Sequence, residues 1–370
     1  MTDLTDQDLF TPVTHPESGV TIYVLSHKVA PVQEAFYFVN NSMSADGRYL
    51  WFYCAFPPAG TAHLGRTLGV LDFHTHEVRC YPETQFGEAS PLVEPETGAV
   101  CWMYDRYVYR RGPQADAPVE LVNAIPDDLI GDRRVQRMAT HLTRSADGSE
   151  FFIDFGMGLQ YVFGSLPLDG GDFEVWHRFD RLYNHAQFSP TDPDRVLFAE
   201  ENHRDPITGL TLRIKNRMWT IRRGQAPQPV FAEPTRVSHE WWDADGEHVW
   251  CVAGNETWRV RLADGQTERL PFPHHCWHSH TSADNCLLLG DSNERFYRGC
   301  ASGVHLLDRE TDTLLKLVDN PERADYAGRH YHIDPHPRFV CDDDYIVFTT
   351  TVRGEIDVAL VRTADLLDHT

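Results

Sequence analysis

The sequence predicts an all-β protein, a seven-bladed β-propeller, on three observations. Short runs of β-branched and aromatic residues, separated by sharp turns, recur at nearly even intervals along the 370 residues. Long amphipathic helical patterns are nearly absent. A motif in which a histidine or asparagine lies six positions before an Asp-Gly or similar turn returns several times. Repeats of about forty to fifty residues with several strands each are the signature of a propeller.

The expected blades can be assigned in order from this motif. Their first strands are expected to begin near Phe38, Ser90, His141, His185, His239, His278 and His336. Asn40 takes the place of the histidine in the first blade, six positions before Asp46. An early strand at about residues 20–25 is available to complete the seventh blade, which is the usual way in which a propeller closes. We therefore expect residues 1–370 to form a single propeller domain.

Two insertions and a tail depart from the repeat. Residues 126–138 are expected to contain a short helix, residues 203–215 to form a long excursion within the fourth blade, and the chain beyond residue 364 to be helical. Loops of this length on one rim of a rigid scaffold often carry substrate contacts.

Composition and charge exclude several kinds of partner. A formal net charge of -22 argues against nucleic acid, because a phosphate backbone needs a basic face. The acidic start of the chain lacks the pattern of a signal peptide, and no stretch is long enough to span a membrane, so a cytoplasmic location is expected. An anionic sugar as substrate would need a local positive patch, which a divalent metal and an arginine could supply.

The histidines of the motif point to a metal site. The first strand of each blade lines the axis of a propeller, so residues in the same phase of successive blades converge there. A ring is therefore expected from His141, His185, His239, His278 and His336, with His280 and His332 close by. Neutral imidazole together with a carboxylate suits a first-row divalent ion such as manganese, iron or zinc.

A second pattern of potential ligands lies at residues 329–339. In an extended strand alternate side chains share one face, so four potential metal ligands would point the same way. These ligands are His330, His332, Asp334 and His336. Asp334 and His336 each precede a proline, which favours extended backbone. The alternative is a polar edge strand whose histidines only bind water.

Other signals are weaker or absent. Gln187 is either a site residue or an ordinary polar residue near the start of a strand, and Glu200 and Glu201 are either site carboxylates or rim residues. No Gly-x-Ser-x-Gly elbow, phosphate-binding loop or dinucleotide fingerprint is present.

Four segments resemble, in the same order, those of the oligogalacturonate lyases. They include Asn-His-Ala-Gln-Phe-Ser-Pro at the start of residues 184–198 and Val-Ser-His-Glu-Trp-Trp-Asp-Ala-Asp-Gly at residues 237–246, with residues 216–219 and 334–339. The resemblance is clearest from about residue 180 onward. It implies a seven-bladed, manganese-dependent, cytoplasmic enzyme. The substrate implied is an anionic oligosaccharide, a short galacturonate oligomer, which the enzyme splits by β-elimination.

The resemblance also implies roles for single residues. By position, His239 matches the catalytic base and Arg217 the arginine that binds the substrate carboxylate. His278 and His336 match two histidine ligands of the metal.

The last blade departs from the family pattern. The family has a glutamine and a further histidine as ligands, where this sequence has Tyr331 and Asp334. We therefore expect His332, Asp334 or both to complete the metal site.

These observations together give one hypothesis and two alternatives. The hypothesis is a metal-dependent uronate lyase, in which His185 and Gln187 join Arg217 in contacting the substrate. The chemistry agrees, because a cation and a guanidinium on the carboxylate acidify the proton that a neutral histidine removes. The alternatives are a lyase for glucuronate- or iduronate-containing oligosaccharides and a non-catalytic propeller that binds protein partners.

Overall fold

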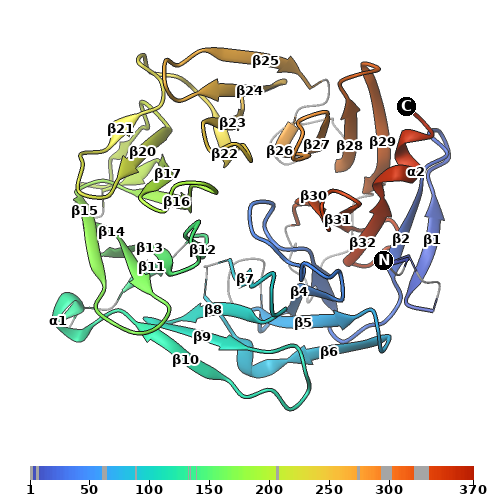
Figure 1. Ribbon diagram of the computed structural model, residues 1–370, viewed down its shortest axis with the longest axis horizontal. Helices are drawn as coiled ribbons and strands as arrows, with labels where there is room; N and C mark the ends of the chain where they lie inside the picture. Colours follow the sequence, from blue (N-terminus) through green and yellow to red (C-terminus); the bar gives the residue numbers. More distant parts are fainter. Residues whose placement is uncertain are drawn as a thin grey trace.

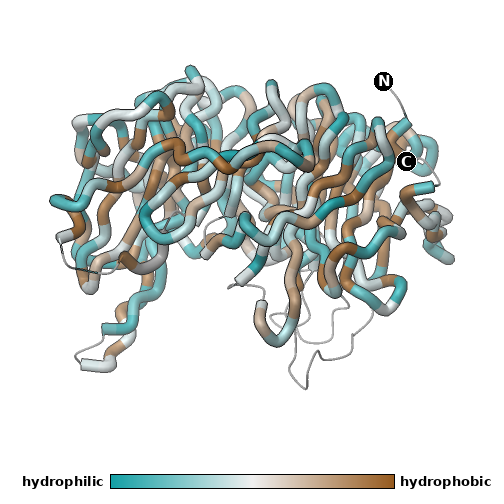
Figure 2. The backbone as a smooth tube through the Cα atoms, turned by 90° about the horizontal axis from the view of Figure 1, so that it is seen from below, coloured by the Kyte–Doolittle hydropathy of each residue, from teal (hydrophilic) through white to brown (hydrophobic). Residues whose placement is uncertain are grey.

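The computed structural model describes residues 3–5, 8–60, 65–87, 90–131, 133, 135–138, 140–205, 208–272, 276–292, 302–320 and 333–370. Within these residues, seven antiparallel sheets follow one another around a common axis (Figure 1). The seven-bladed β-propeller predicted from the sequence is confirmed. Seen edge-on, the ring is flat, with hydrophobic stretches along the strands and hydrophilic colour at many of the turns (Figure 2).

The first four blades run from the inner strand outward as follows. Blade 1 contains β3 (Val32–Glu34), β4 (Tyr49–Ala55), β5 (Thr67–Asp72) and β6 (Glu77–Tyr81). Blade 2 contains β7 (Leu92–Val93), β8 (Val100–Tyr104), β9 (Tyr107–Arg111) and β10 (Glu120–Ala124). Blade 3 contains β11 (Gln136–Met138), β12 (Thr143–Arg144), β13 (Glu150–Met157), β14 (Gln160–Pro167) and β15 (Glu174–Phe179). Blade 4 contains β16 (Tyr183–Phe188), β17 (Arg195–Glu200), β20 (Met218–Arg222) and β21 (Gln228–Pro229).

The remaining blades follow the same order. Blade 5 contains β22 (Ser238–Trp242), β23 (His248–Val252), β24 (Glu256–Arg261) and β25 (Thr267–Pro271). Blade 6 contains β26 (Cys276–Thr281), β27 (Leu287–Ser292), β28 (Ser302–Asp308) and β29 (Thr313–Asn320). Blade 7 contains β30 (Arg338–Val340), β31 (Tyr345–Thr350), β32 (Asp357–Arg362), β2 (Thr21–Leu25) and β1 (Phe10–Thr14).

Short elements complete the fold. The helices are α1 (Asp127–Ile130) and α2 (Thr363–Leu367), with a 3-10 turn, η1 (Pro82–Thr84). The excursion of the fourth blade forms a small hairpin of β18 (His203–Arg204) and β19 (Thr211–Leu212). Among the described residues, no helix has the length and apolar character needed to cross a bilayer.

The ring closes by pairing the two ends of the chain. β2 lies antiparallel to β32, with Tyr23 opposite Leu360 and Val24 opposite Ala359. β31 lies on the other side of β32, and β1 on the other side of β2. Blade 7 is therefore built from residues more than three hundred positions apart, and the blades on both sides of the junction are held at a fixed distance.

The repeated motif corresponds to the turn between the first and second strands of a blade. Ser44, Ser145 and Ser282 each donate a hydroxyl hydrogen bond to the aspartate two residues later, at 2.6, 2.7 and 2.7 Å. The glycine that follows, such as Gly148 with a φ of 74°, adopts the left-handed backbone that glycine tolerates best. The inner strand thus ends at the same level in each of these blades.

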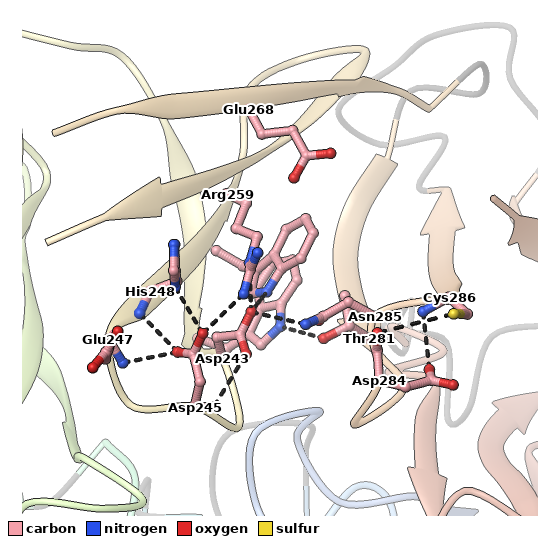
Figure 3. A network of polar contacts seen from close by, with 12 residues as sticks. Asp243, Asp245, Glu247, His248, Arg259, Glu268, Thr281, Asp284, Asn285 and Cys286 are labelled. Atoms are coloured by element: carbon pink, nitrogen blue, oxygen red, sulfur yellow. Dashed lines mark hydrogen bonds and ion pairs between the residues drawn. The ribbon is translucent and has the colours of Figure 1, made fainter. Parts of the chain in front are cut away.

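In the fifth blade, Asp243 takes the place of that serine and joins two blades. Its carboxylate is 1% exposed and accepts hydrogen bonds from Trp250 Nε1 at 2.9 Å, Arg259 Nε at 2.7 Å and Asn285 Nδ2 at 3.1 Å (Figure 3). A buried carboxylate is tolerated when its oxygens are satisfied in this way. Because Asn285 belongs to the turn of the sixth blade, the network fixes the two blades relative to each other.

Aromatic side chains fill the space between neighbouring blades. Phe152 and Phe163 of blade 3 pack edge to face against Phe188 and Phe198 of blade 4, with ring centroids 5.4 and 5.0 Å apart. Edge-to-face pairs of this kind add specificity to the burial of apolar surface. The blades are therefore positioned by packing as well as by hydrogen bonds.

Leu360 tests the contribution of the closure to stability. Its side chain is 0% exposed on β32, so the L360A variant should lose about 2–5 kcal/mol of unfolding free energy through lost burial and a cavity. The matched control is L367A, because Leu367 is 48% exposed on α2 and its loss should change stability by less than about 0.5 kcal/mol. Urea unfolding measures both, and equal effects would contradict this role for the closure.

Candidate functional site

The inner strands of blades 4, 5 and 6 each contain a β-bulge near the beginning of the strand. The pairing register with the second strand shifts at residues 184–187, 238–241 and 276–279. His185, His239 and His278 lie within these bulges. His185 and His239 have φ angles of 56° and 47°, a left-handed conformation that is uncommon outside glycine. Bulges redirect side chains, and here they place the three imidazoles together at one mouth of the ring.

Four histidines, from blades 3, 4, 6 and 7, surround the ring of Tyr37, which precedes the motif of blade 1, and His239 of blade 5 joins them through His278. The ring centroid of Tyr37 lies 4.6 Å from that of His141, 4.8 Å from that of His336 and 5.6 Å from that of His278. Further short centroid distances are His141 to His185 at 5.0 Å, His239 to His278 at 4.4 Å and His278 to His336 at 4.3 Å. Residues that are far apart in the sequence thus form one cluster.

Three residues of this cluster can hold a metal ion. His278, Asp334 and His336 each offer one ligand atom, and these atoms all lie within 4.8 Å of one another. His278 is buried, whereas Asp334 and His336 are half-buried. His332, the other ligand expected from the sequence, lies outside the described residues.

A buried carboxylate beneath the cluster orients His278. Asp291 of β27 accepts a hydrogen bond from the backbone N–H of His278 at 2.8 Å, and its other oxygen lies 3.0 Å from His278 Nδ1. With the Nδ1 proton directed at the carboxylate, Nε2 of His278 is left as the atom that can bind a metal. Two imidazoles and a carboxylate suit manganese, iron or zinc, so the residues present fit a first-row divalent ion.

His239 lies directly beside the metal candidates. Its ring centroid is 4.4 Å from those of both His278 and Trp277. Among the described residues, Nδ1 of His239 has no hydrogen-bond partner. Burial, and then the neighbouring His278, lower the pKa of His239 well below the usual value for histidine. The imidazole is therefore neutral and has a ring nitrogen able to accept a proton.

Arg217 is buried and held by two carboxylates. Its Nε donates to Glu240 at 2.8 Å, one terminal nitrogen donates to the same carboxylate at 3.5 Å, and the other donates to Glu201 at 2.5 Å. Glu240 is 2% exposed, whereas the Glu201 side chain is 24% exposed. The Glu240 and Glu201 charges raise the pKa of Arg217 against the opposing effect of burial. The guanidinium is therefore a permanent cation with a fixed orientation.

The two other expected substrate contacts lie at different depths. His185 Nδ1 lies 2.6 Å from Asn184 Oδ1 and 3.7 Å from Glu201, so His185 belongs to the Arg217 group. Gln187 donates to the backbone carbonyl of Glu240 at 2.9 Å and lines a cavity of about 810 Å³ at the opposite mouth.

His280, expected near the histidine ring, also lines the cavity at the opposite mouth and not the cluster. The reason is geometric, because two residues along a strand correspond to about 6.6 Å of travel. A side chain two positions after a ring histidine therefore lies one layer deeper along the axis.

His141 is buried and Tyr37 is half-buried within the cluster. Burial, and to a lesser extent Arg217, lower the pKa of His141 to about 3. Burial, followed by the negative charge of Glu240, raises the pKa of Tyr37 well above its usual value. Both side chains are therefore neutral near pH 7.

Sequence reasoning missed three residues of the site. Tyr37 lies in an aromatic run, and nothing in the spacing of that run indicates a position on the axis. Glu240 directly follows His239, and its position in the sequence gives no separate indication of a role in the site. Asp291 could have been recognised as a candidate, since it is an isolated acidic residue in the apolar run that forms β27. Glu201, for which a site and a rim position were both open, lies in the site, whereas Glu200 is paired with Arg181 at 2.7 Å.

Comparison with known proteins identifies lyase relatives. No protein-family model matches the chain. Curated relatives include the oligogalacturonide lyase of Pectobacterium atrosepticum, 25% identical over 224 residues, and the oligogalacturonate lyase of Dickeya dadantii, 24% identical over 232 residues. Each match covers 54% of this chain and 55% of the relative, so it spans about half the length of the curated proteins. The resemblance recognised in the sequence is thereby confirmed.

Solved structures show the same fold over almost the whole chain. A structure of oligogalacturonate lyase in complex with manganese matches 96% of this chain and 97% of its own, with a TM-score of 0.75 and 18% identity. The oligogalacturonate lyase from Vibrio parahaemolyticus matches 95% of this chain and 96% of its own, with a TM-score of 0.74 and 15% identity. At these identities the likeness concerns the propeller fold.

His141 gives a test of the buried cluster through the pH dependence of stability. Its pKa is about 3 in the folded protein and about 6.5 in an unfolded chain. Between these values the unfolded state binds the extra proton, so stability falls as the pH falls, by up to about 1.4 kcal/mol per pH unit. The H141F variant lacks this proton site.

Urea unfolding at pH 7 and pH 4 measures the difference. From the higher to the lower pH, the wild type should lose roughly 3 kcal/mol more unfolding free energy than H141F. Equal losses in the two proteins would contradict the burial of a neutral His141.

Proposed function

We propose that this chain is a divalent-metal-dependent lyase that splits short galacturonate oligomers by β-elimination. The observation that carries the proposal is the meeting of His239, Arg217 and the His278–Asp334–His336 group at one mouth of the ring. Curated relatives are lyases for oligogalacturonate, and one fold neighbour bears that name in complex with manganese. Manganese is therefore the metal we assign first.

The reaction needs three functions from the site. The proton on C5, next to the uronate carboxylate, must be removed, and the electron pair it leaves forms the double bond between C4 and C5. The C4–O bond breaks as this double bond forms, and its electron pair stays on the leaving oxygen, which takes up a proton. Negative charge develops on the carboxylate as the proton leaves, so cationic groups on that carboxylate lower the barrier.

Arg217 binds the carboxylate. Three of its N–H groups donate to Glu240 and Glu201 within the described part of the chain, and a guanidinium has five. Glu240, fully buried, holds the orientation, while Glu201 is the more exposed partner. His278, Asp334 and His336 would hold the metal, which would supply a second positive charge and a Lewis acid at this mouth of the ring.

His239 takes the C5 proton. Its neutral imidazole lies beside His278, and therefore beside the place where the carboxylate is held. A positioned histidine base contributes roughly 10²–10⁴-fold to the rate of a proton transfer. Tyr37 donates the proton to the leaving oxygen, because its ring lies between His141 and His336 and its hydroxyl remains protonated.

A lyase for glucuronate- or iduronate-containing oligomers is the second candidate. The observation that favours it is Asp334 in the ligand group, where the resemblance implied a different ligand. A panel of short uronate oligomers distinguishes the two, because the preferred sugar should be cleaved with the highest kcat/KM. Cleavage of galacturonides alone supports the first candidate, and cleavage of glucuronides or iduronides alone overturns it.

Replacing His239 by alanine should abolish turnover while leaving metal binding intact. Loss of the base should lower kcat by roughly 10²–10⁴-fold, measured from the ultraviolet absorbance of the unsaturated product. The control is H74A, because His74 is exposed on the turn between β5 and β6 and should be without effect. A loss of bound manganese in H239A would instead place His239 among the metal ligands.

A further inference from the structure

Asp291 lies beneath the candidate metal site. Its carboxylate accepts a hydrogen bond from a backbone N–H that has no partner in the β-ladder. It is 0% exposed on β27, opposite the bulge that contains His278. Cys276 pairs with Ser292 and Ser279 pairs with Gly290, so the bulged residues have no partner in the ladder. The backbone N–H of His278 is thereby left for another acceptor, and buried N–H groups are rarely without one.

The Asp291 carboxylate accepts from three donors that belong to two different blades. One oxygen accepts the His278 backbone N–H at 2.8 Å. The other oxygen lies 3.0 Å from His278 Nδ1 and accepts the backbone N–H of His336 at 3.0 Å. A single carboxylate therefore holds the ring of one potential ligand and the backbone of another.

The contact with His336 is important because that residue is in an uncommon conformation. His336 has a φ of 48° and lies between two prolines, before the first residue of β30. A left-handed non-glycine residue is kept in place only by its surroundings. The hydrogen bond from blade 6 is such a constraint, and it sets the distance between the two histidines.

The charge of Asp291 favours a cation above it. Among the described residues, no lysine or arginine contacts this carboxylate, and its hydrogen-bond donors are two backbone groups and one imidazole. A buried negative charge without a cationic partner is costly. A divalent ion on His278 Nε2 would supply the missing positive charge through the imidazole, as in carboxylate–histidine–metal arrangements generally.

We propose that Asp291 is the positioning residue of the metal centre: it selects the His278 tautomer that presents Nε2 to the ion and locks His336 at ligand distance. The inference rests on the metal-binding part of the proposed function and does not depend on the sugar that is cleaved. Asp291 itself touches neither substrate nor metal.

The D291N variant keeps the shape of the side chain but replaces one accepting oxygen by a donating NH2 group. If the amide oxygen still accepts the His278 backbone N–H, the amide NH2 faces His278 Nδ1 and the N–H of His336. The NH2 then donates to Nδ1, which puts the imidazole proton on Nε2, and it opposes the N–H of His336. D291N should therefore weaken metal binding even when the protein is folded.

Blade 3 offers a matched control. Asp154 of β13 is 2% exposed and accepts from the backbone N–H and hydroxyl of Thr140 at 3.0 and 3.1 Å, just before His141. It is a buried carboxylate at the corresponding place in another blade, and the potential metal-ligand group found among the described residues does not include its neighbour His141. D154N should lower stability and leave metal binding unchanged.

Calorimetric titration of the metal-free protein with manganese, without sugar, tests the proposal. D291N should raise the Kd by roughly 10–100-fold, and D154N should not change it. Wild-type affinity in D291N, an equal loss in D154N, or no manganese binding by the wild type would overturn the proposal. Tight binding that D291N weakens, in a protein that cleaves no galacturonide, would support Asp291 while refuting the proposed substrate.

A second measurement covers the case in which D291N does not fold. Nitrogen-15 NMR of the metal-free wild type distinguishes the two imidazole tautomers, and H278Q identifies the His278 signals. The proposal expects the proton of His278 on Nδ1. A proton on Nε2 would overturn it.

Discussion

The closure of the ring by β2 and β32 is the constraint on which the candidate site depends. The side chains of the site come from blade 1 and from blades 3 to 7, and none of these blades contains more than part of the site. His278 and His336 lie on adjacent blades that meet just before the closing strands. Closure of the ring holds blades 6 and 7 in place, and the hydrogen bond from His336 to Asp291 then sets the separation of the two histidines, so the junction in blade 7 stabilises both the fold and the site.

Local backbone strain directs the side chains within that frame. The left-handed conformations of His185, His239 and His336, together with the bulges, turn one residue per blade toward the axis. Asp291 and Asp243 show how buried carboxylates then hold strands of different blades in register. The strain at the mouth of the ring is offset by hydrogen bonds that lie one layer deeper.

The electrostatics of the site explain how an acidic protein could accept an anionic sugar. The chain carries a net charge of -22, and two carboxylates already neutralise Arg217. An additional cation is needed to attract a uronate, and the cluster of His278, Asp334 and His336 is the place where the chain can hold one. The neutral His141 and His239 add no positive charge of their own, so a metal ion in this cluster would be the main attraction for a uronate.

Much of this arrangement could be predicted from the sequence, because residues at the same position of successive repeats lie at the same level around the axis of a propeller. The fold and the meeting of the five histidines follow from the spacing of the motif. The depth of His280 and Gln187 along the axis could not be predicted from the motif, since it depends on how far the chain advances along an inner strand between neighbouring residues. Tyr37, Glu240 and Asp291 act through contacts between blades, and no local pattern of residues records those contacts.

The most direct test of the account is the mass of the products formed from galacturonate oligomers, with manganese added or with chelator. Elimination splits the chain without gain of water, whereas hydrolysis adds one water for each bond cut. The account predicts manganese-dependent products whose masses sum to that of the substrate. Products heavier by one water, or the same products in the presence of chelator, would contradict it.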